Sequence, residues 1–343
     1  MKALVTGGGG FIGRWIVRKL IERGDRVRVL GRRKYPELQK IGVETVQGNI
    51  CCSKIVEDAC RGVDCVFHVA ALTGIWGPWE EFYQTNVIGT RTIIAGCQKQ
   101  RVPRLVYTSS PSVVHDQADQ INLDETAPYP QEYLCPYPET KAMAERMVLL
   151  ANGREGLSTV ALRPHLVWGP EDTNLIPRLL ERARQGKLIR VGDGRNKVDL
   201  TYVENVAQAH LLAADRLADP SSGVAGEVFF ISQGEPVLLW PWIDQFLQNL
   251  GLPTVKKSIP LAVAKKIGWA IEKYYHTFHL SGEPAMTRFL ASQLGTSHYF
   301  NIRKARERLN YIPEVSMEEG LRRSVAFYSK RINKKGKNSQ KHR

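Results

Sequence analysis

Tyr137 and Lys141 are the residues of this 343-residue chain whose types and spacing most directly indicate chemistry. They lie in the run Tyr137-Pro138-Glu139-Thr140-Lys141, so on a helix their side chains share one face. A free tyrosine has a pKa of about 10, and a neighbouring ammonium favours the phenolate. We therefore expect Lys141 to lower the pKa of Tyr137. Such a phenol can give or take a proton while hydride moves to or from a carbon atom.

A hydroxyl at the end of the preceding strand supplies a partner for the phenol. Residues Leu105–Ser109 have the composition of a buried strand, and Ser110 follows it. We assign Ser110 as the group that hydrogen-bonds the substrate oxygen beside Tyr137. Ser109 and Ser112 are more simply interpreted as capping or turn residues, and Ser112 is also placed beside the substrate.

A glycine-rich turn near the N-terminus predicts a dinucleotide site. Gly7, Gly10 and Gly13 lie between the predicted strand Ala3–Thr6 and an amphipathic helix that continues to Leu20. The three glycines would serve a tight turn, a close approach to the pyrophosphate and helix–sheet packing. Backbone groups at the start of the helix would face the phosphates. The residues assigned to the pyrophosphate are Gly7, Gly9, Gly10, Phe11, Ile12 and Gly13.

Two arginines stand where an NAD enzyme would carry an acid. The second predicted strand, Arg26–Leu30, is followed by Gly31-Arg32-Arg33. An acid there would bond the ribose 2′-hydroxyl of NAD, whereas two guanidiniums suit the extra phosphate of NADP. The sequence therefore favours NADP(H) as cofactor through Arg32 and Arg33, and NAD(H) stays open.

Further cofactor contacts are expected at the ends of the next two strands. Asn49 and Ile50 follow the third strand, where the Asn49 amide would reach adenine or simply form a turn. The small residues of Val69-Ala70-Ala71 follow the fourth strand and would let the cofactor backbone come close. His68, just before them, is interpreted as a packed, hydrogen-bonded histidine rather than a catalyst.

Strand and helix patterns alternate over the first half of the chain, which predicts an α/β fold with a doubly wound parallel sheet of the Rossmann type. After Pro164 the pattern changes, and a smaller, mostly helical substrate lobe is expected. The NAD(P)-binding domain is assigned to residues 1–165 and 196–235, and the substrate lobe to residues 166–195 and 236–328. Residues 329–343, which have no apolar period, are predicted to be a basic disordered tail.

The composition and charge of the chain limit the kinds of protein that it can be. The formal net charge is +14, and seven of the basic residues lie in 330–343, where there is no acid. We read that tail as solubilising rather than as a specific nucleic-acid site. No apolar run is long enough to span a bilayer, no signal peptide is recognised, and the six cysteines form no C-x-x-C pair. These features predict a cytoplasmic protein with reduced thiols and no metal site.

Together these motifs resemble the extended short-chain dehydrogenase/reductase superfamily, over residues 1 to about 328. Additional matching runs begin at Asn86, Leu162, Trp168, Val191 and Tyr202. Within it the chain looks most like the 3β-hydroxysteroid dehydrogenase/isomerase group, including sterol-4α-carboxylate 3-dehydrogenases and bacterial 2-alkyl-3-oxoalkanoate reductases. The resemblance implies an oxidoreductase that interconverts 3-hydroxy and 3-oxo groups on a hydrophobic substrate. It also implies that Asn86 supports the active-site proton path and that Pro164 lies near the nicotinamide.

The substrate residues follow from less specific signals. Trp76 and Trp79, in the loop after the fourth strand, suit an apolar substrate or simply close the core between lobes, and Trp168 is also placed at the substrate. The mixed apolar and basic segment 265–280 is interpreted as a buried helix, with peripheral membrane contact as the alternative. A homodimer stays open.

Two other functions stay open as alternatives. A nucleotide-sugar epimerase or dehydratase would share the serine, tyrosine and lysine, but Trp76 and Trp79 offer little to a sugar. A redox-sensing NADP-binding protein would not need to retain the tyrosine.

Overall fold

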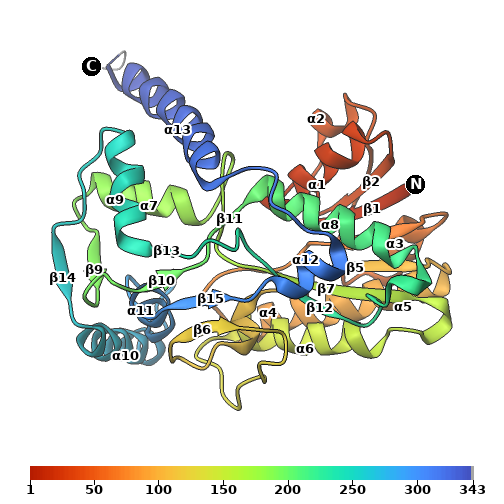
Figure 1. Cartoon of the computed structure of the whole chain (residues 1–343), viewed down its shortest axis with the longest axis horizontal. Coiled ribbons are helices and arrows are strands. Elements are labelled where there is room, and N and C mark those ends of the chain that lie inside the picture. The colour runs from red at the N-terminus through yellow and green to blue at the C-terminus, as the bar shows by residue number, and fades with distance from the viewer. Residues whose placement is uncertain (341–343) are drawn as a thin grey trace.

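A parallel sheet of seven strands forms the centre of the larger domain (Figure 1). The structure, a computed structural model, describes residues 1–340. The spatial order β12-β7-β5-β4-β1-β2-β3 reverses direction between β1 and β4, as in a doubly wound fold, and this confirms the predicted class. The strands are β1 (Lys2–Thr6), β2 (Arg26–Gly31), β3 (Glu44–Gln47), β4 (Cys65–His68), β5 (Arg104–Thr108), β7 (Ser158–Pro164) and β12 (Val228–Ile231).

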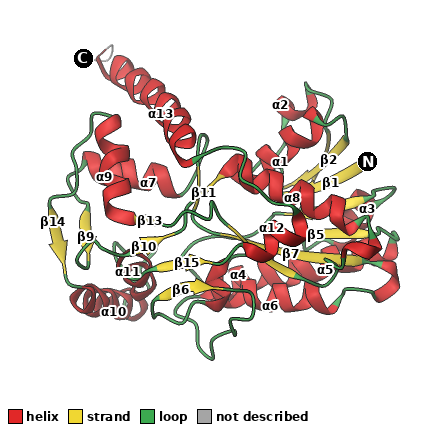
Figure 2. Cartoon of the chain, viewed as in Figure 1, coloured by secondary structure: helices red, strands yellow, loops and turns green. Residues whose placement is uncertain are grey.

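Helices cover both faces of this sheet, as Figure 2 shows. Helices α1 and α8 pack against each other on one face, and α3, α5 and α6 lie on the other. A short π-helix, η1, leads directly into α5. These helices and their short neighbours are α1 (Phe11–Glu22), α2 (Pro36–Gln39), α3 (Ser53–Cys60), α4 (Trp79–Phe82), η1 (Tyr83–Ile88), α5 (Gly89–Lys99), η2 (Pro111–Val114), α6 (Pro136–Leu150), η3 (Arg154–Gly156), α8 (Val203–Leu217) and η4 (Pro220–Ser222).

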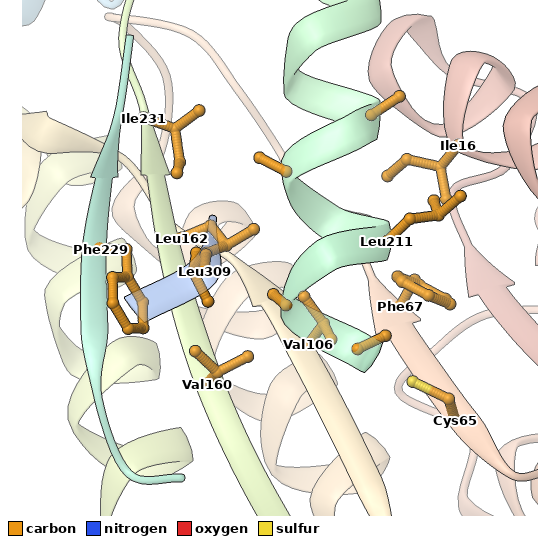
Figure 3. Close-up of a cluster of buried hydrophobic side chains, with 14 of the residues drawn as sticks. Ile16, Cys65, Phe67, Val106, Val160, Leu162, Leu211, Phe229, Ile231 and Leu309 are labelled. Carbon is orange, nitrogen blue, oxygen red and sulfur yellow. The ribbon is translucent and has the colours of Figure 1, made fainter. Parts of the chain in front are cut away.

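Side-chain alternation along the strands builds the two cores. Val5 and Phe67 face α1 and α8, whereas their neighbours Leu4 and Val66 face α3, α5 and α6. Figure 3 shows the first of these cores, where Phe67, Val106 and Leu211 meet between sheet and helices. Because both faces are covered, the strands carry nearly continuous apolar runs, and this made them visible in the sequence.

A smaller lobe lies beyond the carboxyl ends of the strands (Figure 1). Its core is separate from the two sheet cores and is rich in tryptophan, with Trp168, Trp240 and Trp242 buried together. It contains short strand pairs and several helices. The elements of the chain not yet given, most of them in this lobe, are β6 (Gln120–Leu123), β8 (Val167–Trp168), α7 (Leu175–Arg184), β9 (Ile189–Val191), β10 (Lys197–Val198), β11 (Thr201–Tyr202), β13 (Val237–Leu238), α9 (Leu239–Asn249), β14 (Lys257–Ile259), α10 (Leu261–Thr277), α11 (Arg288–Gly295), β15 (His298–Phe300), α12 (Arg303–Leu309) and α13 (Met317–Gln340).

Helix α10 lies at the outer edge of the smaller lobe (Figure 1). Only Ala264, Gly268 and Glu272 of this helix are buried, so the interpretation of segment 265–280 as a buried helix was wrong. None of the helices in residues 1–340 is long and apolar enough to cross a membrane.

The division between the two parts differs from the predicted boundaries in three places. Strands β6 and β10, expected in the nucleotide domain, belong to a four-stranded sheet with β13 and β15. Conversely α12, expected in the substrate lobe, packs on α8 and β12, with Ala305 and Leu309 in the core of the larger domain. Long-range pairing of short segments decides these positions, and short segments carry little periodicity.

Helix α13 corrects the prediction of a disordered tail from residue 329. The helix continues to Gln340, and residues 341–343 lie outside the described part. Lysine, arginine and glutamine are good helix formers, and the preceding helical turns remove the cost of nucleation.

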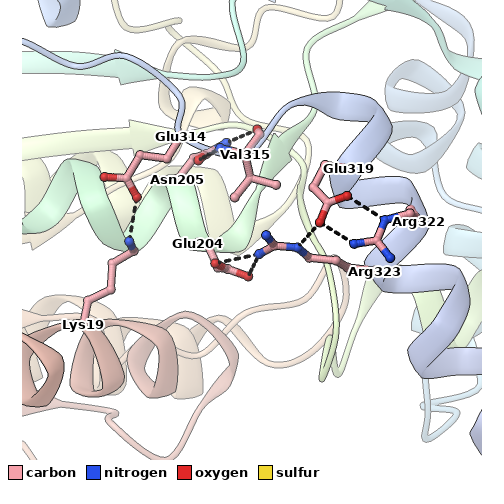
Figure 4. A network of polar contacts seen from close by, with 8 residues as sticks. All are labelled: Lys19, Glu204, Asn205, Glu314, Val315, Glu319, Arg322 and Arg323. Carbon is pink, nitrogen blue, oxygen red and sulfur yellow. Dashed lines mark hydrogen bonds and ion pairs between the residues drawn. The ribbon is translucent and has the colours of Figure 1, made fainter.

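Contacts at the start of α13 join the C-terminal segment to the larger domain, as Figure 4 shows. Arg323 bonds both oxygens of Glu204 on α8, at 3.0 and 3.1 Å. The Asn205 amide donates to the carbonyl of Val315 and accepts from its N–H. The buried amide pair fixes this junction more firmly than the partly exposed ion pair does.

Candidate active site

The glycine-rich turn between β1 and α1 is closed by backbone contacts. Gly7 has a φ of +70° and donates its N–H to Leu30 O. A Cβ on Gly13 would overlap the carbonyl oxygen of Gly7 and lie 2.8 Å from Cα of Gly8. No side chain caps the start of α1, so its first N–H groups face the space in front of the helix. That arrangement fits an anionic pyrophosphate over the turn.

The end of β2 carries the two predicted arginines and one residue that sequence reasoning missed. Arg32 and Arg33 are exposed, and neither forms an ion pair within the described residues. The ring of Tyr35 lies on Gly9 and Gly31: a Cβ at Gly9 would overlap it, and a Cβ at Gly31 would lie 2.5 Å from its hydroxyl. Tyr35 therefore covers the place where the adenosine ribose is expected. Its contact with Gly9, which is distant in the sequence, left no signal in the sequence itself.

Asn49 and Ile50 have separate roles at the end of β3. The Asn49 side chain is exposed, and its Oδ1 accepts the N–H of Cys51 at 3.0 Å, forming a turn ahead of α3. Ile50 is buried and packs against Gly89 at the start of α5. The turn interpretation of Asn49 is thus confirmed, and an adenine contact stays a prediction.

His68 holds the strand end that precedes the small residues. Its Nδ1 bonds Thr6 Oγ1 at 2.8 Å, and its Nε2 bonds Thr90 Oγ1 at 2.9 Å. Thr6 Oγ1 also accepts the N–H groups of Val69 and Ala70, at 3.2 Å each. Burial lowers the pKa of His68 to about 3, so the ring is neutral. The interpretation of His68 as a packed histidine is confirmed.

Tyr137 and Lys141 project from the first turns of α6 into a cavity of about 210 Å³ at the strand ends. Val69, Ala71, Ser110 and Pro164 also line it. The Lys141 ammonium donates to Thr108 O at 2.6 Å and lies 4.1 Å from the centroid of the Tyr107 ring. Ile12 from the glycine-rich turn reaches the same cavity, so the predicted catalytic and cofactor residues meet there.

The pKa values of Tyr137 and Lys141 differ from what the sequence led us to expect for the two residues. Burial raises the pKa of Tyr137 to about 12, although its hydrogen bond with Ser110 acts in the opposite direction. Burial also lowers the pKa of Lys141 to about 7, against the attraction of Glu145. In the protein without cofactor, desolvation therefore dominates the pKa of Tyr137, and the lowering predicted from Lys141 together with an oxidised nicotinamide stays a prediction.

Ser110 and Ser112 form a hydroxyl pair next to the phenol. Their Oγ atoms are 2.9 Å apart, and the N–H of Ser112 donates to Ser110 Oγ at 3.2 Å. Both residues line a second cavity of about 200 Å³, which Tyr137 and Pro164 also border. Ser109, by contrast, has a buried hydroxyl without a partner among the described residues and lines only the first cavity.

Asn86 lies on the π-helix η1 and positions the loop after β4. Its Oδ1 accepts the N–H of Leu72 at 2.7 Å, and its Nδ2 donates to Leu72 O and Thr140 Oγ1. Asn86 is buried and lines neither cavity. It connects the loop to α6, and a part in the proton path stays a prediction.

A buried ion pair holds α6 against β7. Arg163 and Glu145 approach within 2.6 Å with side chains 3% and 0% exposed, and Tyr129 donates to the same carboxylate. Glu145 lies one turn after Lys141, so this pair fixes the rotation of the helix. Removing one partner of such a pair typically costs about 3–5 kcal/mol.

The structure places the three predicted substrate tryptophans outside the second cavity. Trp76 packs on α10, with its ring 4.7 Å from that of His276. Trp79 stacks on Tyr83 and donates to Glu139. Trp168 is fully buried in the core of the smaller lobe. Large aromatic residues pack wherever the fold buries apolar surface, so residue type alone could not locate the substrate site.

Residues from distant segments of the chain line the second cavity instead. It is bordered by the loop 73–75, by Leu166, and by residues of the smaller lobe that follow α10. Sequence reasoning missed its polar wall of three histidines and two glutamines, and its apolar wall of two phenylalanines. They are His115, His165, His298, Gln120, Gln293, Phe289 and Phe300.

Two of these histidines, His165 and His298, form a hydrogen-bonded pair with defined protons. Gln293 O can only accept, so His298 Nε2 donates to it at 2.8 Å, and His298 Nδ1 accepts from His165 Nε2 at 2.6 Å. His165 Nδ1 is then a lone-pair acceptor, and it has no partner among the described residues. Burial lowers the pKa of His165 and brings that of His298 to about 4, so both rings are neutral at pH 7.

Comparisons with known proteins agree with this geometry. The family model of the 3-beta hydroxysteroid dehydrogenase/isomerase family matches residues 4–263. A 2-alkyl-3-oxoalkanoate reductase of Stenotrophomonas maltophilia is 48% identical over 95% of this chain and 99% of that protein. A sterol-4-alpha-carboxylate 3-dehydrogenase (decarboxylating) of Mus musculus is 35% identical over 95% of this chain and 91% of its own.

Solved structures share the fold at lower identity. MoeE5 in complex with UDP-glucose and NAD superposes with a TM-score of 0.74 at 25% identity, covering 97% of this chain and 100% of that one. Similarity to a nucleotide-sugar enzyme is thus distant, whereas the named relatives are reductases and dehydrogenases, so the redox-sensor alternative is also disfavoured. The chain belongs to the 3-beta hydroxysteroid dehydrogenase/isomerase family and is an NAD(P)-dependent oxidoreductase of CH–OH and keto groups.

Proposed function

We propose that this protein is an NADP(H)-preferring enzyme that interconverts a 3-oxo and a 3-hydroxy group beside an acid group on a lipophilic substrate. One observation carries the proposal: Tyr137, Ser110 and Pro164 line both cavities, the one reached by the glycine-rich turn and the one walled by histidines and phenylalanines. Cofactor and substrate can therefore meet at the phenol.

The chemistry needs a proton and a hydride on opposite ends of one C=O bond. A bound nicotinamide supplies the hydride to the carbon in reduction and takes it back in oxidation. Ser110 and Tyr137 hydrogen-bond the oxygen, and Tyr137 gives its proton as the C=O π bond breaks. At neutral pH the phenol is protonated, because its pKa is about 12, and this is the form that reduction requires.

The acid group follows from the names of the relatives and from His165. A 2-alkyl-3-oxoalkanoate and a sterol-4-alpha-carboxylate both carry a carboxylate on a carbon adjacent to the reacting C3. His165 lines the substrate cavity with a free Nδ1, and a carboxylate bound beside it would favour protonation of that nitrogen, which would then donate to the carboxylate. Phe289 and Phe300 offer an apolar wall to the rest of the molecule.

The preference for NADP(H) is supported by Arg32 and Arg33. Both guanidiniums are exposed at the end of β2, and β2 is followed by no acid that would bond a ribose 2′-hydroxyl. A 2′-phosphate there would gain charge-assisted hydrogen bonds. Tyr35, which lies over the same spot, must move aside or stack on the adenosine when the cofactor binds.

The test is a two-way panel with the full chain. Initial rates are measured for long-chain 2-alkyl-3-oxoalkanoates, 3-ketosteroids and UDP-sugars, each with NADPH and with NADH. We expect turnover of the oxo acid, NADPH favoured in kcat/KM, and a shift toward NADH in the Arg32→Ser/Arg33→Ser variant. Turnover of UDP-sugars alone, with cofactor retained after purification, would contradict the proposal.

A further inference from the structure

Lys141 carries a buried amine that forms no ion pair with a carboxylate within residues 1–340. The residue is 2% exposed, and its ammonium donates one hydrogen bond, to Thr108 O at 2.6 Å. Glu145, one turn further along α6, is held by Arg163 through hydrogen bonds of 3.0 and 2.6 Å. An ammonium has three N–H donors, and the carbonyl satisfies one of them. A buried charge with so few partners requires another source of stabilisation.

The aromatic ring of Tyr107 lies against this amine. The Lys141 Nζ is 4.1 Å from the centroid of the ring, well inside the distance of about 6 Å over which a cation is attracted to an aromatic face. Tyr107 is 1% exposed and shares a core with Ala144 and Val148 of α6. Burial raises its pKa well above the usual value, so the phenol is uncharged. The contact therefore joins a cation to a neutral ring in a site without solvent, where this attraction is strongest.

The other titratable groups around Lys141 do not offset its charge. His68, on β4, is neutral because burial lowers its pKa to about 3. Tyr137, one turn earlier on α6, is protonated at neutral pH. Glu145 attracts the ammonium, but its carboxylate is engaged by an arginine of β7, which carries a like charge. The direct contacts of the ammonium thus come from two adjacent residues of β5, through a carbonyl group and a ring.

We propose that Tyr107 is a positioning residue of the active site, whose ring keeps Lys141 charged and holds its ammonium at the cofactor cavity. Lys141 lines the cavity that the glycine-rich turn reaches, so the donors not used by Thr108 are available to a ligand there. Without the aromatic face, burial would favour the neutral amine. Such an amine would neither attract a phenolate nor offer a full set of donors.

The stability of the protein as a function of pH tests this charge without substrate or cofactor. Burial lowers the pKa of Lys141 from its ordinary value of 10.5 to about 7. Attraction to the ring acts only on the protonated amine, so it raises that pKa relative to a variant without the ring. Its contribution to stability is therefore present below the pKa and is lost as pH rises through it. Tyr107→Phe keeps the ring and removes a hydroxyl without a partner among the described residues, whereas Tyr107→Leu removes the ring.

We expect a pH-dependent difference between these two variants of the full chain in urea unfolding. The folding equilibrium constant of Tyr107→Phe divided by that of Tyr107→Leu should be at least about tenfold larger at about pH 5.5 than at about pH 9. The part of this ratio that does not change with pH reports the cavity left by leucine. Tyr107→Met, which also lacks a ring, replaces Tyr107→Leu if that variant does not fold.

The matched control is the same pair of variants with Lys141→Met added, where the ratio should be equal at both pH values. Two outcomes would overturn the proposal. A ratio that is equal at both pH values with Lys141 present would show that Tyr107 only fills the core. A pH-dependent ratio that persists in the Lys141→Met background would assign the effect to another titrating group.

The consequence for catalysis rests on the proposed reaction at Tyr137, whereas the charge on Lys141 does not. Because a charged Lys141 favours the phenolate, kcat for alcohol oxidation at pH 7 should fall about tenfold in Tyr107→Leu and stay near the parent value in Tyr107→Phe. A pH-dependent stability ratio with unchanged oxidation would leave the charge assignment in place and would count against a part for Lys141 in the proposed reaction.

Discussion

The cofactor end and the substrate end of the active site are assembled in different ways. The glycine-rich turn, with the two arginines after β2, comes from the first 33 residues, and backbone contacts within them fix the turn. The substrate cavity takes its walls from residues 73 to 300, in at least five separate segments. Function at the first end depends on local backbone geometry, whereas function at the second depends on how two lobes pack.

This difference explains which residues tolerate change. A backbone cradle for phosphates needs glycine at fixed positions because an added Cβ meets other backbone atoms. A cavity wall needs only a side chain of the right size and polarity, which many segments can supply. The phenol of Tyr137 stands between the two ends and borders both cavities.

The largest effect is expected where the two ends meet. Tyr137→Phe removes the proton donor while keeping the ring, so kcat should fall at least about a hundredfold. The melting temperature and the Kd for NADPH should stay near those of the parent protein. Near-normal turnover in this variant would remove Tyr137 from the chemistry and leave the two cavities without a common catalytic group.

The pH dependence of alcohol oxidation should also be large. Oxidation needs the phenolate, and burial raises the pKa of Tyr137 to about 12, so the phenolate fraction rises about tenfold per pH unit below that value. We expect kcat for oxidation to rise from pH 6 toward alkaline pH, with an earlier plateau if oxidised nicotinamide lowers the pKa. Reduction should be nearly flat over the same range. A flat oxidation profile would show that nearby positive charge, rather than burial, sets the pKa of Tyr137.

Two glycine substitutions distinguish a glycine needed for packing of the turn from a glycine needed for close approach of the cofactor. In Gly13→Ala the new methyl meets backbone atoms of Gly7 and Gly8, so the Kd for NADPH should rise at least about tenfold and the melting temperature should fall. In Gly10→Ala the nearest protein atom would be the carbonyl oxygen of Gly7 at 3.1 Å, a milder contact, so the melting temperature should fall less than in Gly13→Ala while the Kd should still rise. Unchanged binding in both variants would place the dinucleotide elsewhere.

At the substrate end, His165→Leu should act on recognition of the acid group. The variant removes the Nδ1 that would donate to the bound carboxylate once protonated, so KM for a 3-oxo acid should rise about tenfold, one hydrogen bond to a charged group being worth about 1.5 kcal/mol. KM for the corresponding methyl ester and the Kd for NADPH should change little. If KM rises by the same factor for the acid and the ester, His165 shapes the cavity but does not bind the acid group.

The smallest effect is expected at Trp79. Its indole donates to Glu139 and stacks on Tyr83 but does not line the substrate cavity. Trp79→Phe should therefore leave kcat/KM for any accepted substrate within about twofold, in the range of ordinary surface substitutions. A larger loss of kcat/KM with unchanged stability would mean that the loop after β4 closes over the substrate.

The sequence by itself determined the sheet, the glycine-rich turn and the pairing of Tyr137 with Lys141. Buried strands, glycine spacing and the Tyr137–Lys141 interval are local patterns, and each reflects a constraint acting within a few residues. Only the tertiary structure decided the protonation of that pair, because burial depends on atoms far along the chain. It likewise decided that Trp168 is core, that His165 lines the second cavity, and that α10 is exposed. Residue type gives a side chain its chemistry, but what surrounds that side chain is set by contacts between distant segments.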